Sequence, residues 1–452
     1  MVNCYLQSLA THNVSAEITW RNISGNNYEV TIVTYTRISS PVSPPGLEIF
    51  WGDGTSDTII QVNGNGVPVA LDLKKNIYTG THLYPGPGTY ILSMQDLNRD
   101  AGIINIPNSV NIPMYVQSEL KILPGVINNH SPEFIAMPSY EALANDKYTG
   151  NVTVYDEDGD CIKYELVPCM MDVNTNIPAY FFPPAANSFG IDSINGEMVW
   201  DYATLQGKYS FAVKVSEWRN GIELGYVMRD FEINAYQVPG FYHAFSGLNL
   251  WQTDANGNYA YTRQAGDSIE LNLSYTDSAN SVFDLNAYSE TFIVSDTAIF
   301  SKTVTGNTIN AFYKWNPDVS NVRSSPYVVT FRGESATAQG TIRSDVTLLI
   351  YVWDANTLPC SFVTGLDEPN TSENIQWYFN PVTNNFSIEL PCDWIGSVFK
   401  MYNATGQLIL QKRFISTNQL NIDASAMADG IYIAEIKNKT GKPLRSKLVK
   451  SN

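Results

Sequence analysis

The sequence is poor in the residues on which most soluble enzymes depend. It has four histidines and five cysteines in 452 residues, and charged residues make up only 16%. No two histidines stand at metal-ligand spacing, and the sequence has no G-x-S-x-G, no H-E-x-x-H and no phosphate-binding glycine loop. We therefore predict that the chain is not an enzyme. The paired carboxylates of a glycoside hydrolase would leave no such motif, so that class stays open.

Long apolar runs and an excess of positive charge are also missing. No run approaches the ~18 apolar residues that a membrane helix needs, so we predict no membrane-spanning segment. The net charge of −17 repels phosphate backbones, which makes nucleic acid an unsuitable partner. The same acidity is compatible with hard cations such as calcium.

The cysteines show neither a C-x-x-C pair nor a zinc pattern. They are Cys4, Cys161, Cys169, Cys360 and Cys392. Cys161 and Cys169 flank a strand-like run at 162–167, whose extended ends would lie roughly 25 Å apart, beyond disulfide reach. We expect no Cys161–Cys169 bond unless this run folds back, and we expect buried or free thiols.

Strand patterns fill the rest of the chain. Apolar and polar residues alternate at 28–33, 209–215 and 269–275, and the N-G-N-G run at 63–66 is typical of a tight turn. Helical periodicity is almost absent. The sequence therefore predicts an all-β protein of tandem immunoglobulin-like β-sandwiches with a small C-terminal β-sandwich.

A chain of this length needs several cores, about three to five by size. Polar and proline-containing breaks suggest the boundaries. We expect a signal-peptide remnant or frayed terminus at 1–10, and sandwich units at 11–121 (first unit), 122–238 (second unit) and 239–358 (third unit). A linker is expected at 359–375 and a last unit at 376–452.

The second and third units look like divergent repeats. In the second, Trp200 precedes a tyrosine-led strand that begins at Tyr209, and in the third, Trp315 precedes one that begins at Tyr327. A long hairpin and a final strand follow in both. This order predicts a core tryptophan beside two central strands of each sandwich.

The first unit carries W-G-D-G-T at 51–55 and H-L-Y at 82–84, followed by P-G-P-G-T-Y. Over about residues 11–121 it resembles PKD-type immunoglobulin-like domains. We expect Trp51 in the core, a tight turn at Gly52 and Gly54, and Asp53 bound to backbone N–H groups of that turn. His82 is expected to be structural rather than a catalytic base.

The second unit carries an acidic run, Y-D-E-D-G-D at 155–160, and F-G-I-D at 189–192. It is similar to cadherin-like domains of bacterial surface proteins. The alternating carboxylates of Asp156, Asp158 and Asp160 can converge on one hard cation, so we expect calcium here if the chain binds any metal. A solvated acidic turn is the alternative. The glycine at the fourth position of the run and the missing distal glutamate argue against an EF-hand.

The last unit carries an ordered set of short motifs behind the linker. Its marker residues are Asn380, Pro381, Gly406, Asp429, Gly430, Ile431, Tyr432 and Lys450. Residues 376–452 resemble the type A C-terminal sorting domain of the Bacteroidota type IX secretion system. Phe379 stands where the family often has proline, and two residues follow Lys450. A plain small sandwich would not explain the whole ordered set at this end of the chain.

That resemblance implies a route and a location. A type IX translocon would carry the chain through the outer membrane, and a sortase would remove the sorting domain by cutting within the linker. The product would be extracellular or on the outer cell surface. We predict an exported binding or adhesion protein, with gliding-related surface work or scaffolding as further possibilities.

The alternative is a secreted glycan-binding or glycan-degrading protein. The sequence leaves the ligand open between a surface protein and a glycan. An exposed planar row of tryptophan and tyrosine would favour the glycan, and a fully buried set of tryptophans would favour the binding or adhesion role.

Overall fold

The computed structural model describes residues 13–40, 44–70, 72–96, 98–126, 128–219, 221–254, 257–278, 283–323, 325–354, 377–380, 385–389, 398–403, 406–413, 419–423, 427, 430–437 and 443–450. In this part of the chain the regular elements are strands, apart from four three-residue 3-10 helices. These are η1 (Ser109–Asn111), η2 (Leu248–Leu250), η3 (Glu290–Phe292) and η4 (Val319–Asn321). The all-β prediction is confirmed. None of the described helices has the length and apolar character to cross a membrane.

The largest sheet contains strands from both the first and the second unit. Its strands run in the order β13 (Cys161–Val167), β18 (Gly207–Arg219), β19 (Ile222–Tyr236), β1 (Asn13–Ser24), β2 (Asn27–Arg37), β6 (Leu73–Leu83), β4 (Ser56–Gln61), β3 (Gly46–Phe50), β7 (Gly88–Asp96), β8 (Met114–Ile122), β14 (Met170–Asp172) and β15 (Thr175–Asn176). Two further strands join it, β5 (Val67–Ala70) beside β6 and β10 (Glu141–Leu143) beside β19.

Strand β19 joins the first two units. It pairs antiparallel with β1, where Ala16 faces Asp230, and with β8, where Gly225 faces Leu120. Most of β19 is buried over consecutive residues instead of on alternate ones. A strand covered on both faces has this continuous pattern, because neither face meets water. Its polar residues are accordingly paired, and Arg99 donates two bonds to the Asp230 carboxylate at 2.9 and 2.6 Å.

The second unit adds two small sheets over this joint. One has the order β11 (Lys147–Asn151), β17 (Glu197–Ala203), β16 (Ala185–Ile191), and the other pairs β9 (Glu133–Phe134) with β12 (Val154–Tyr155). Trp200, Phe211 and Phe231 lie in the core that they enclose.

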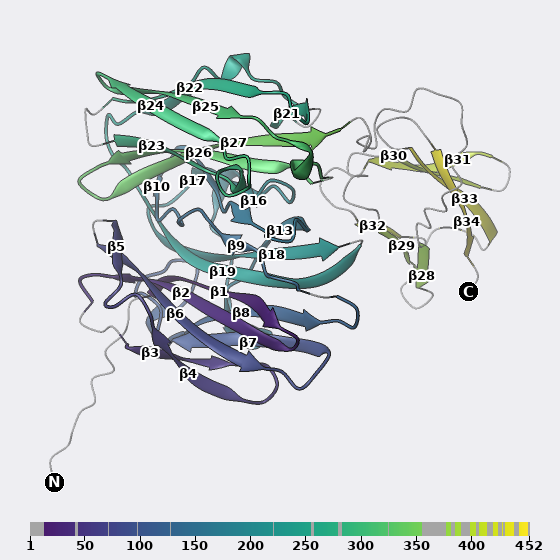
Figure 1. The fold of residues 1–452 in the computed structure, drawn as a ribbon, viewed down its shortest axis with the longest axis horizontal. Helices are drawn as coiled ribbons and strands as arrows, with labels where there is room; N and C mark the ends of the chain where they lie inside the picture. The colour runs from purple at the N-terminus through teal and green to yellow at the C-terminus, as the bar shows by residue number, and fades with distance from the viewer. Residues whose placement is uncertain are drawn as a thin grey trace, which may run out of the picture.

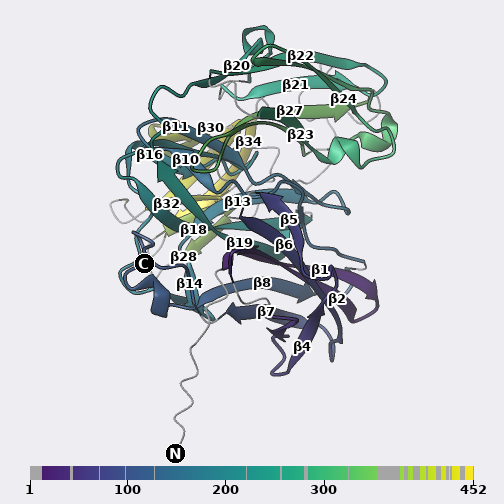
Figure 2. The same cartoon turned by 90° about the vertical axis from the view of Figure 1, so that its left-hand side faces the viewer.

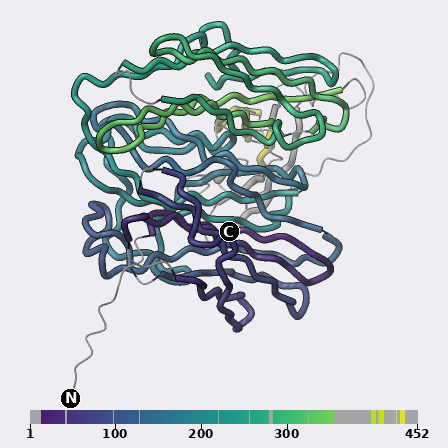
Figure 3. Tube along the Cα trace, turned by 60° about the vertical axis from the view of Figure 1, so that its left-hand side comes forward, coloured from purple at the N-terminus to yellow at the C-terminus, as the bar shows by residue number. Residues whose placement is uncertain are grey.

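The third unit is a sandwich of two four-stranded sheets. One has the order β20 (His243–Ser246), β22 (Ile269–Asp277), β25 (Thr308–Trp315), β24 (Ile299–Thr305); the other has the order β21 (Tyr259–Gln264), β27 (Thr341–Trp353), β26 (Tyr327–Ala336), β23 (Phe283–Tyr288). Strand β22 alternates strictly between buried and more exposed residues, as one-sided packing requires. Figures 1 and 2 show the third unit stacked on the second, which in turn lies on the first, and Figure 3 shows the same succession along the chain trace.

Polar contacts hold the third unit against the second. The Asp345 carboxylate accepts a 2.7 Å bond from the backbone N–H of Asn151, and the Thr153 and Thr330 hydroxyls lie 2.7 Å apart. Arg332 is buried, pairs with Asp345 and donates to the carbonyl of Asn151 at 3.2 Å. Buried hydrogen bonds and an ion pair therefore hold the third unit against the second.

The predicted repeat is visible as the same tryptophan–tyrosine pair in both units. The Trp200 and Tyr209 rings meet edge to face with centroids 5.1 Å apart, and those of Trp315 and Tyr327 do so at 4.7 Å. Each indole N–H donates to a loop carbonyl, Trp200 at 3.0 Å and Trp315 at 2.6 Å. Both tryptophans are buried core residues, as the sequence predicts.

The predicted turn of the first unit is also present. Trp51 is buried, and Gly52 and Gly54 have φ of 84° and 91°. One Asp53 oxygen accepts from the backbone N–H of Thr55 at 3.0 Å, and the other lies 2.8 Å from His82 Nε2. The His82 ring stacks on Trp51. The histidine is thus part of the turn's packing, as expected for a structural residue.

The last unit has its own two sheets. One has the order β28 (Trp377–Asn380), β29 (Asn385–Glu389), β32 (Gln419–Asp423), and the other has the order β31 (Leu408–Arg413), β30 (Val398–Asn403), β33 (Gly430–Lys437), β34 (Pro443–Lys450). Phe399, Met401, Ala434 and Ile436 are fully buried in it. The predicted segments 1–10 and 359–375 lie outside the described residues.

The two described cysteines differ in state. Cys169 is free and buried, whereas Cys161 is disulfide-bonded. The prediction that these two do not pair is confirmed, because the intervening residues form the extended strand β13. The expectation of a free thiol was wrong for Cys161, since sequence spacing alone does not reveal which cysteines the fold brings together.

Candidate functional site

The predicted acidic run forms a tight loop between β12 and β13. Gly159 has φ of 73°, which reverses the chain there. One oxygen of Asp156, Oδ1, accepts from the backbone N–H groups of Asp158 at 3.1 Å and Asp160 at 2.9 Å. The loop is therefore wound around the Asp156 carboxylate.

The three predicted metal-binding aspartates do not all point the same way. Asp158 accepts from the backbone N–H of His130 at 2.7 Å and pairs with its ring at 3.2 Å. Asp160 is held by the Arg219 guanidinium through bonds of 2.7 and 2.8 Å. The structure brings Asp156 and Asp160 together and directs Asp158 to a histidine.

A residue that the sequence reading missed completes the cluster. One ligand oxygen each from Asp156, Asp160 and Glu217 lies within 4.8 Å of the other two, and all three residues are buried. Glu217 belongs to β18, on the same side as Tyr209, Phe211, Val213 and Val215, which all lie in the core. A carboxylate that continues an inward-facing apolar row is the sequence signal that could have identified it.

Burial and like charge act together on this cluster. Burial raises the pKa of Asp156 to about 7, and the charges of Asp160, Asp158 and Glu290 act in the same direction. Burial also raises the pKa of Glu217 well above its usual range, with Asp156 and Asp160 contributing. The cluster therefore favours proton or cation binding over three free carboxylates.

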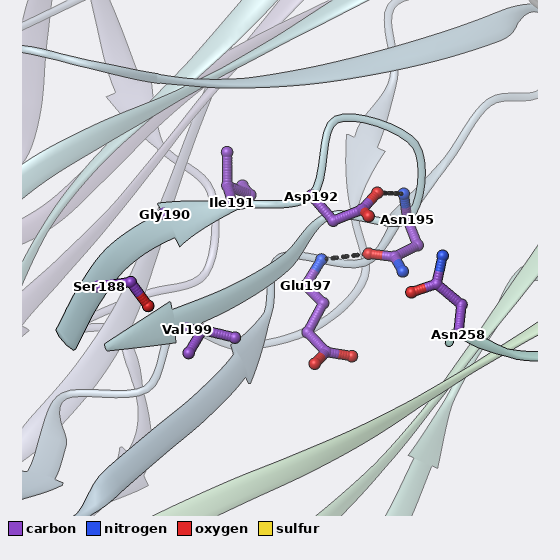
Figure 4. Close-up of a pocket in the computed structure, with 8 residues that line it drawn as sticks. All are labelled: Ser188, Gly190, Ile191, Asp192, Asn195, Glu197, Val199 and Asn258. Atoms are coloured by element: carbon purple, nitrogen blue, oxygen red, sulfur yellow. Dashed lines mark hydrogen bonds between the residues drawn. The ribbon is translucent and has the colours of Figure 1, made fainter. Parts of the chain in front are cut away.

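A second candidate is an open pocket of about 280 Å³ (Figure 4). It is lined by Ser188, Gly190, Ile191, Asp192, Asn195, Glu197, Val199 and Asn258. Asp192 accepts from the Asn195 N–H at 3.0 Å, and the Asn195 side chain accepts from the Glu197 N–H at 2.7 Å, so both side chains serve the β16–β17 turn. No lining residue is aromatic. Such a pocket offers a sugar ring nothing to stack on.

The tryptophans bear on the choice between glycan and macromolecular ligands. Among residues whose side chains the structure describes, Trp20, Trp51, Trp200, Trp251 and Trp315 are buried, and Trp218 and Trp353 are half-buried. The five buried tryptophans belong to the hydrophobic cores of the three units. The fully buried set that would favour binding or adhesion is thus met by five of the described tryptophans and not by Trp218 and Trp353.

The markers of the last unit form turns and strand pairs where they are described. Gly406 has φ of 83° and donates its N–H to the carbonyl of Asn403 at 3.0 Å. The Asn403 side chain accepts from the Gln407 N–H at 2.9 Å and closes the same turn. Asn380 ends β28. Pro381 and Asp429 lie outside the described residues.

The final strand pair contains the remaining markers. Gly430 faces Lys450, Ile431 faces Val449 and Tyr432 faces Leu448 in the β33–β34 ladder. Tyr432 is buried. Strand β34 lies at the edge of its sheet, so its loss would uncover β33.

This region matches a family model described as a secretion system C-terminal sorting domain, over residues 376–451. Residues 376–451 are a type IX sorting domain. The sorting domain marks the chain for export by the type IX secretion system to the cell surface or the extracellular space. No curated protein matches the chain.

The solved structures to which the chain is similar share little of its sequence. The I-band fragment I67-I69 from titin is 10% identical, covers 72% of this chain and 92% of its own, and has a TM-score of 0.17. Mouse cadherin-23 EC22-24 is 15% identical, with 72% and 86% covered and a TM-score of 0.17. The sialic acid binding region of the Streptococcus sanguinis SK1 adhesin is 12% identical, with 89% and 93% covered and a TM-score of 0.19.

Proposed function

We propose that the chain is a non-enzymatic binding or adhesion protein of the cell surface, released from its sorting domain by cleavage in the linker at 359–375. A type IX translocon and a sortase are its partners during export. A surface protein or a glycan is its partner afterwards.

The sorting domain is the observation that carries the export part of this proposal. Its match covers 376–451, and its strands pair only with one another in the described sheets. A module that completes its own sheets can be removed without opening the rest of the chain. This supports a role as a sorting signal that is cleaved off after export.

The stacked units support the binding part. Sheet pairing through β19 fixes the first unit to the second, and buried polar contacts fix the second to the third. Such a stack can hold exposed loops at fixed distances from one another, which suits a surface that binds a macromolecule. Five tryptophans are buried in the cores and so cannot stack on a sugar ring at the surface, which weighs against the glycan alternative.

Two histidines support a non-enzymatic role. His82 and His130 each pair with an aspartate that also accepts backbone N–H bonds, Asp53 in the first unit and Asp158 in the second. A carboxylate that holds a turn or loop together gives its histidine a structural partner. Neither pair includes a serine or cysteine nucleophile.

A reporter fusion tests the proposal. A reporter joined to residues 361–452 is expected outside a host that has the type IX system, and in the periplasm when this segment is deleted. Mass spectrometry of the exported full chain should find a new C-terminus between residues 361 and 376. A fusion that extends only from residue 398 is a control, since it lacks strands β28 and β29.

Three results would contradict the proposal at different points. Equal export of the reporter without residues 361–452 would refute the sorting role of this segment. An intact C-terminus at Asn452 on every exported copy would refute the cleavage in the linker but not the export. Hydrolysis of a glycan by the purified chain would contradict the non-enzymatic role.

A further inference from the structure

A lysine of the second unit contacts a buried carboxylate of the first unit. Lys208, in β18, donates from Nζ to Oδ2 of Asp100 at 2.6 Å. Asp100 lies between β7 and β8, so this contact crosses from one unit to the other. The Asp100 side chain is 3% exposed and that of Lys208 is 30% exposed. The end of a long side chain is thus held against a carboxylate that water hardly reaches.

The main chain on either side of Asp100 is fixed by the fold. The preceding residue, Arg99, makes two bonds to the buried Asp230 carboxylate. The carbonyl of Asp100 itself accepts from the Ser109 hydroxyl at 2.7 Å. Lys208 is held in the same place, because its carbonyl accepts from the backbone N–H of Ile104 at 2.8 Å. The two side chains therefore meet because the backbone on both sides is anchored.

A second buried carboxylate lies beside the pair. Glu232 of β19 is 5% exposed, and its Oε1 lies 3.7 Å from Nζ of Lys208. Its other oxygen, Oε2, is buried without a hydrogen-bond partner in the described part of the chain. Burial raises the pKa of Glu232 to about 7, and the charge of Asp100 acts in the same direction. Glu232 can therefore take up and release a proton near neutral pH.

Arg37 of β2 contacts both carboxylates. Its Nε donates to Oδ2 of Asp100 at 3.1 Å, and its Nη2 donates to Oε1 of Glu232 at 3.2 Å. A fixed guanidinium at Oδ2 stabilises negative charge that develops on this oxygen when a nucleophile adds to the carboxyl carbon. The same positive charge disfavours the protonated form of the nearby lysine amine.

The distance between the two groups suits bond formation. A nitrogen 2.6 Å from a carboxylate oxygen lies roughly 3.4 Å from the carboxyl carbon at an ordinary hydrogen-bond angle, which is a near-attack separation. The lysine pairs of the third unit differ, because Lys302 meets Asp284 and Lys314 meets Glu270 at exposed carboxylates. Water competes for those groups, so they serve as internal controls.

We propose that Nζ of Lys208 and the carboxyl carbon of Asp100 condense to an amide, a covalent cross-link between the first and second units. The N–C bond forms and one C–O bond of Asp100 breaks. Of the three protons on the ammonium group, one stays on the amide nitrogen and two leave with the departing oxygen as water. Glu232 carries these protons from nitrogen to oxygen and ends in its starting state, so the step needs no oxidant or further reactant.

The fold supplies the driving force for this condensation. Two well-oriented groups of one molecule reach effective concentrations on the order of 10⁵–10⁸ M, far above the concentration of water that would reverse the step. The amide would close the chain between residues 100 and 208, and such a cross-link restricts the unfolded state. It would keep the first two units joined when a surface protein is pulled. The cross-link does not depend on the export proposal.

Mass spectrometry of the full chain, produced in a host without the type IX system, tests the proposal. We expect the reduced chain to be lighter than its sequence mass by one water. Trypsin should fail to cut after Lys208 and should release peptide 100–121 joined to peptide 164–214. Because this chain is not exported, the result is independent of sorting and of cleavage in the linker.

Three variants assign the roles. Lys208→Arg keeps the positive charge but removes the nucleophile, because a guanidinium does not lose its proton, so this variant should have its full sequence mass. Glu232→Gln keeps the shape of the side chain and removes the proton carrier, so the cross-linked fraction should fall to roughly a tenth or less. Lys302→Arg, at an exposed pair, should be cross-linked like the parent chain.

Pulling single molecules from their two ends measures the consequence. Residues 101–207 lie inside the cross-link, so the unfolded parent chain should be roughly 350 Å shorter than unfolded Lys208→Arg. An ion pair at the same place would not shorten the unfolded chain. This readout therefore separates the covalent bond from a merely structural contact.

The opposite results overturn the proposal. A parent chain at its full sequence mass, with trypsin cutting after Lys208, would show that the contact remains an ion pair. A cross-link that persists in Lys208→Arg would place the bond at another lysine, and equal cross-linking in Glu232→Gln would refute the role of Glu232. The mass and peptide map of the parent chain decide the matter even where a variant fails to fold.

Discussion

The second and third units repeat one pattern but differ in how complete each is by itself. Both contain a tryptophan, a tyrosine-led strand and a long hairpin. The ring pair Trp200–Tyr209 in the second unit corresponds to the pair Trp315–Tyr327 in the third. The third unit closes two four-stranded sheets from its own strands. The second unit extends its main sheet into the first unit through β19.

This difference shows that a sequence repeat need not be an independent folding unit. The hairpin β26–β27 of the third unit has β23 and β21 as outer neighbours, all from the same unit. The equivalent hairpin β18–β19 has β13 on one side, and on the other it has β1 and β8 of the first unit together with the short strand β10 of the second. A fragment limited to 122–238 would leave β19 without β1 and β8, and an uncovered strand edge promotes aggregation.

The largest expected effect comes from Arg229, which crosses the joint. Its guanidinium pairs with Glu17 of β1 and donates to the carbonyl of Ala136 at 2.8 Å, and both charged residues are buried. Arg229→Ala would leave Glu17 charged and unpaired, so we expect a loss of about 3–5 kcal/mol. Hydrogen exchange should show β1 and β19 losing protection together while β22 keeps it.

Two variants check that interpretation. Lys314→Ala removes the exposed pair of Lys314 with Glu270 in the third unit and should change stability little, because solvent screens such a pair. Arg229→Met combined with Glu17→Gln removes both charges and should recover most of the loss. Independent unfolding of β1 and β19 in Arg229→Ala would contradict a shared unit.

The crossing of β19 and β8 gives the next effect. A Cβ at Gly225 would lie 2.4 Å from the carbonyl oxygen of Glu119, which belongs to the backbone and cannot turn aside. We expect Gly225→Ala to cost about 3 kcal/mol through forced separation of the strands. Urea unfolding measures it. Gly190→Ala, in β16, meets nothing within 4 Å and should be close to neutral.

The contact between the second and third units has its own pH signature. Burial raises the pKa of Glu141 in β10 to about 7, because Arg343 and Arg37 only partly compensate and Glu334 opposes them. The carboxyl of Glu141 has a pKa of about 4.5 in the unfolded chain and about 7 in the folded chain. At a pH between these two values, Glu141 is protonated in the folded state and ionised in the unfolded state. Stability from this group is therefore present below about pH 4.5 and is lost as pH rises to about 7.

Removing the Glu141 charge should flatten this dependence. Glu141→Gln is expected to stabilise the chain at pH 8 by on the order of 2 kcal/mol and to change little at pH 5. Urea unfolding at both pH values measures the difference. Glu270→Gln, at an exposed pair, should change stability little at either pH. Equal effects of Glu141→Gln at both pH values would show that its carboxylate is ionised throughout.

Features formed by residues close together in the sequence could be predicted, and features formed by residues far apart in the sequence could not. The Trp51 turn, the core positions of Trp200 and Trp315, and the Gly406 turn follow from residues within a few positions of one another. The pairing of β19 with β1 joins residues more than 200 positions apart, as Ala16 and Asp230 are, and no local pattern encodes it. Glu217 and Asp158 illustrate the same limit. The run of aspartates was evident, but only the fold decides that Asp158 meets His130 and that Glu217 joins Asp156.

The sorting domain contrasts with the first two units, which share a sheet, because its turns should be independent of the three stacked units. A Cβ at Gly406 meets nothing within 4 Å, so only its φ of 83° requires glycine. Gly406→Ala should therefore cost the sorting domain about 1 kcal/mol, the strain of an L-residue in the left-handed region, and leave the melting of the first three units unchanged. Gly406→Asn is the matched control, since asparagine tolerates this conformation and should lose less. Segment-resolved hydrogen exchange on the full chain measures both variants. Protection changed in β22 or β19 by Gly406→Ala would mean that the sorting domain is coupled to the stack and is not a self-contained address.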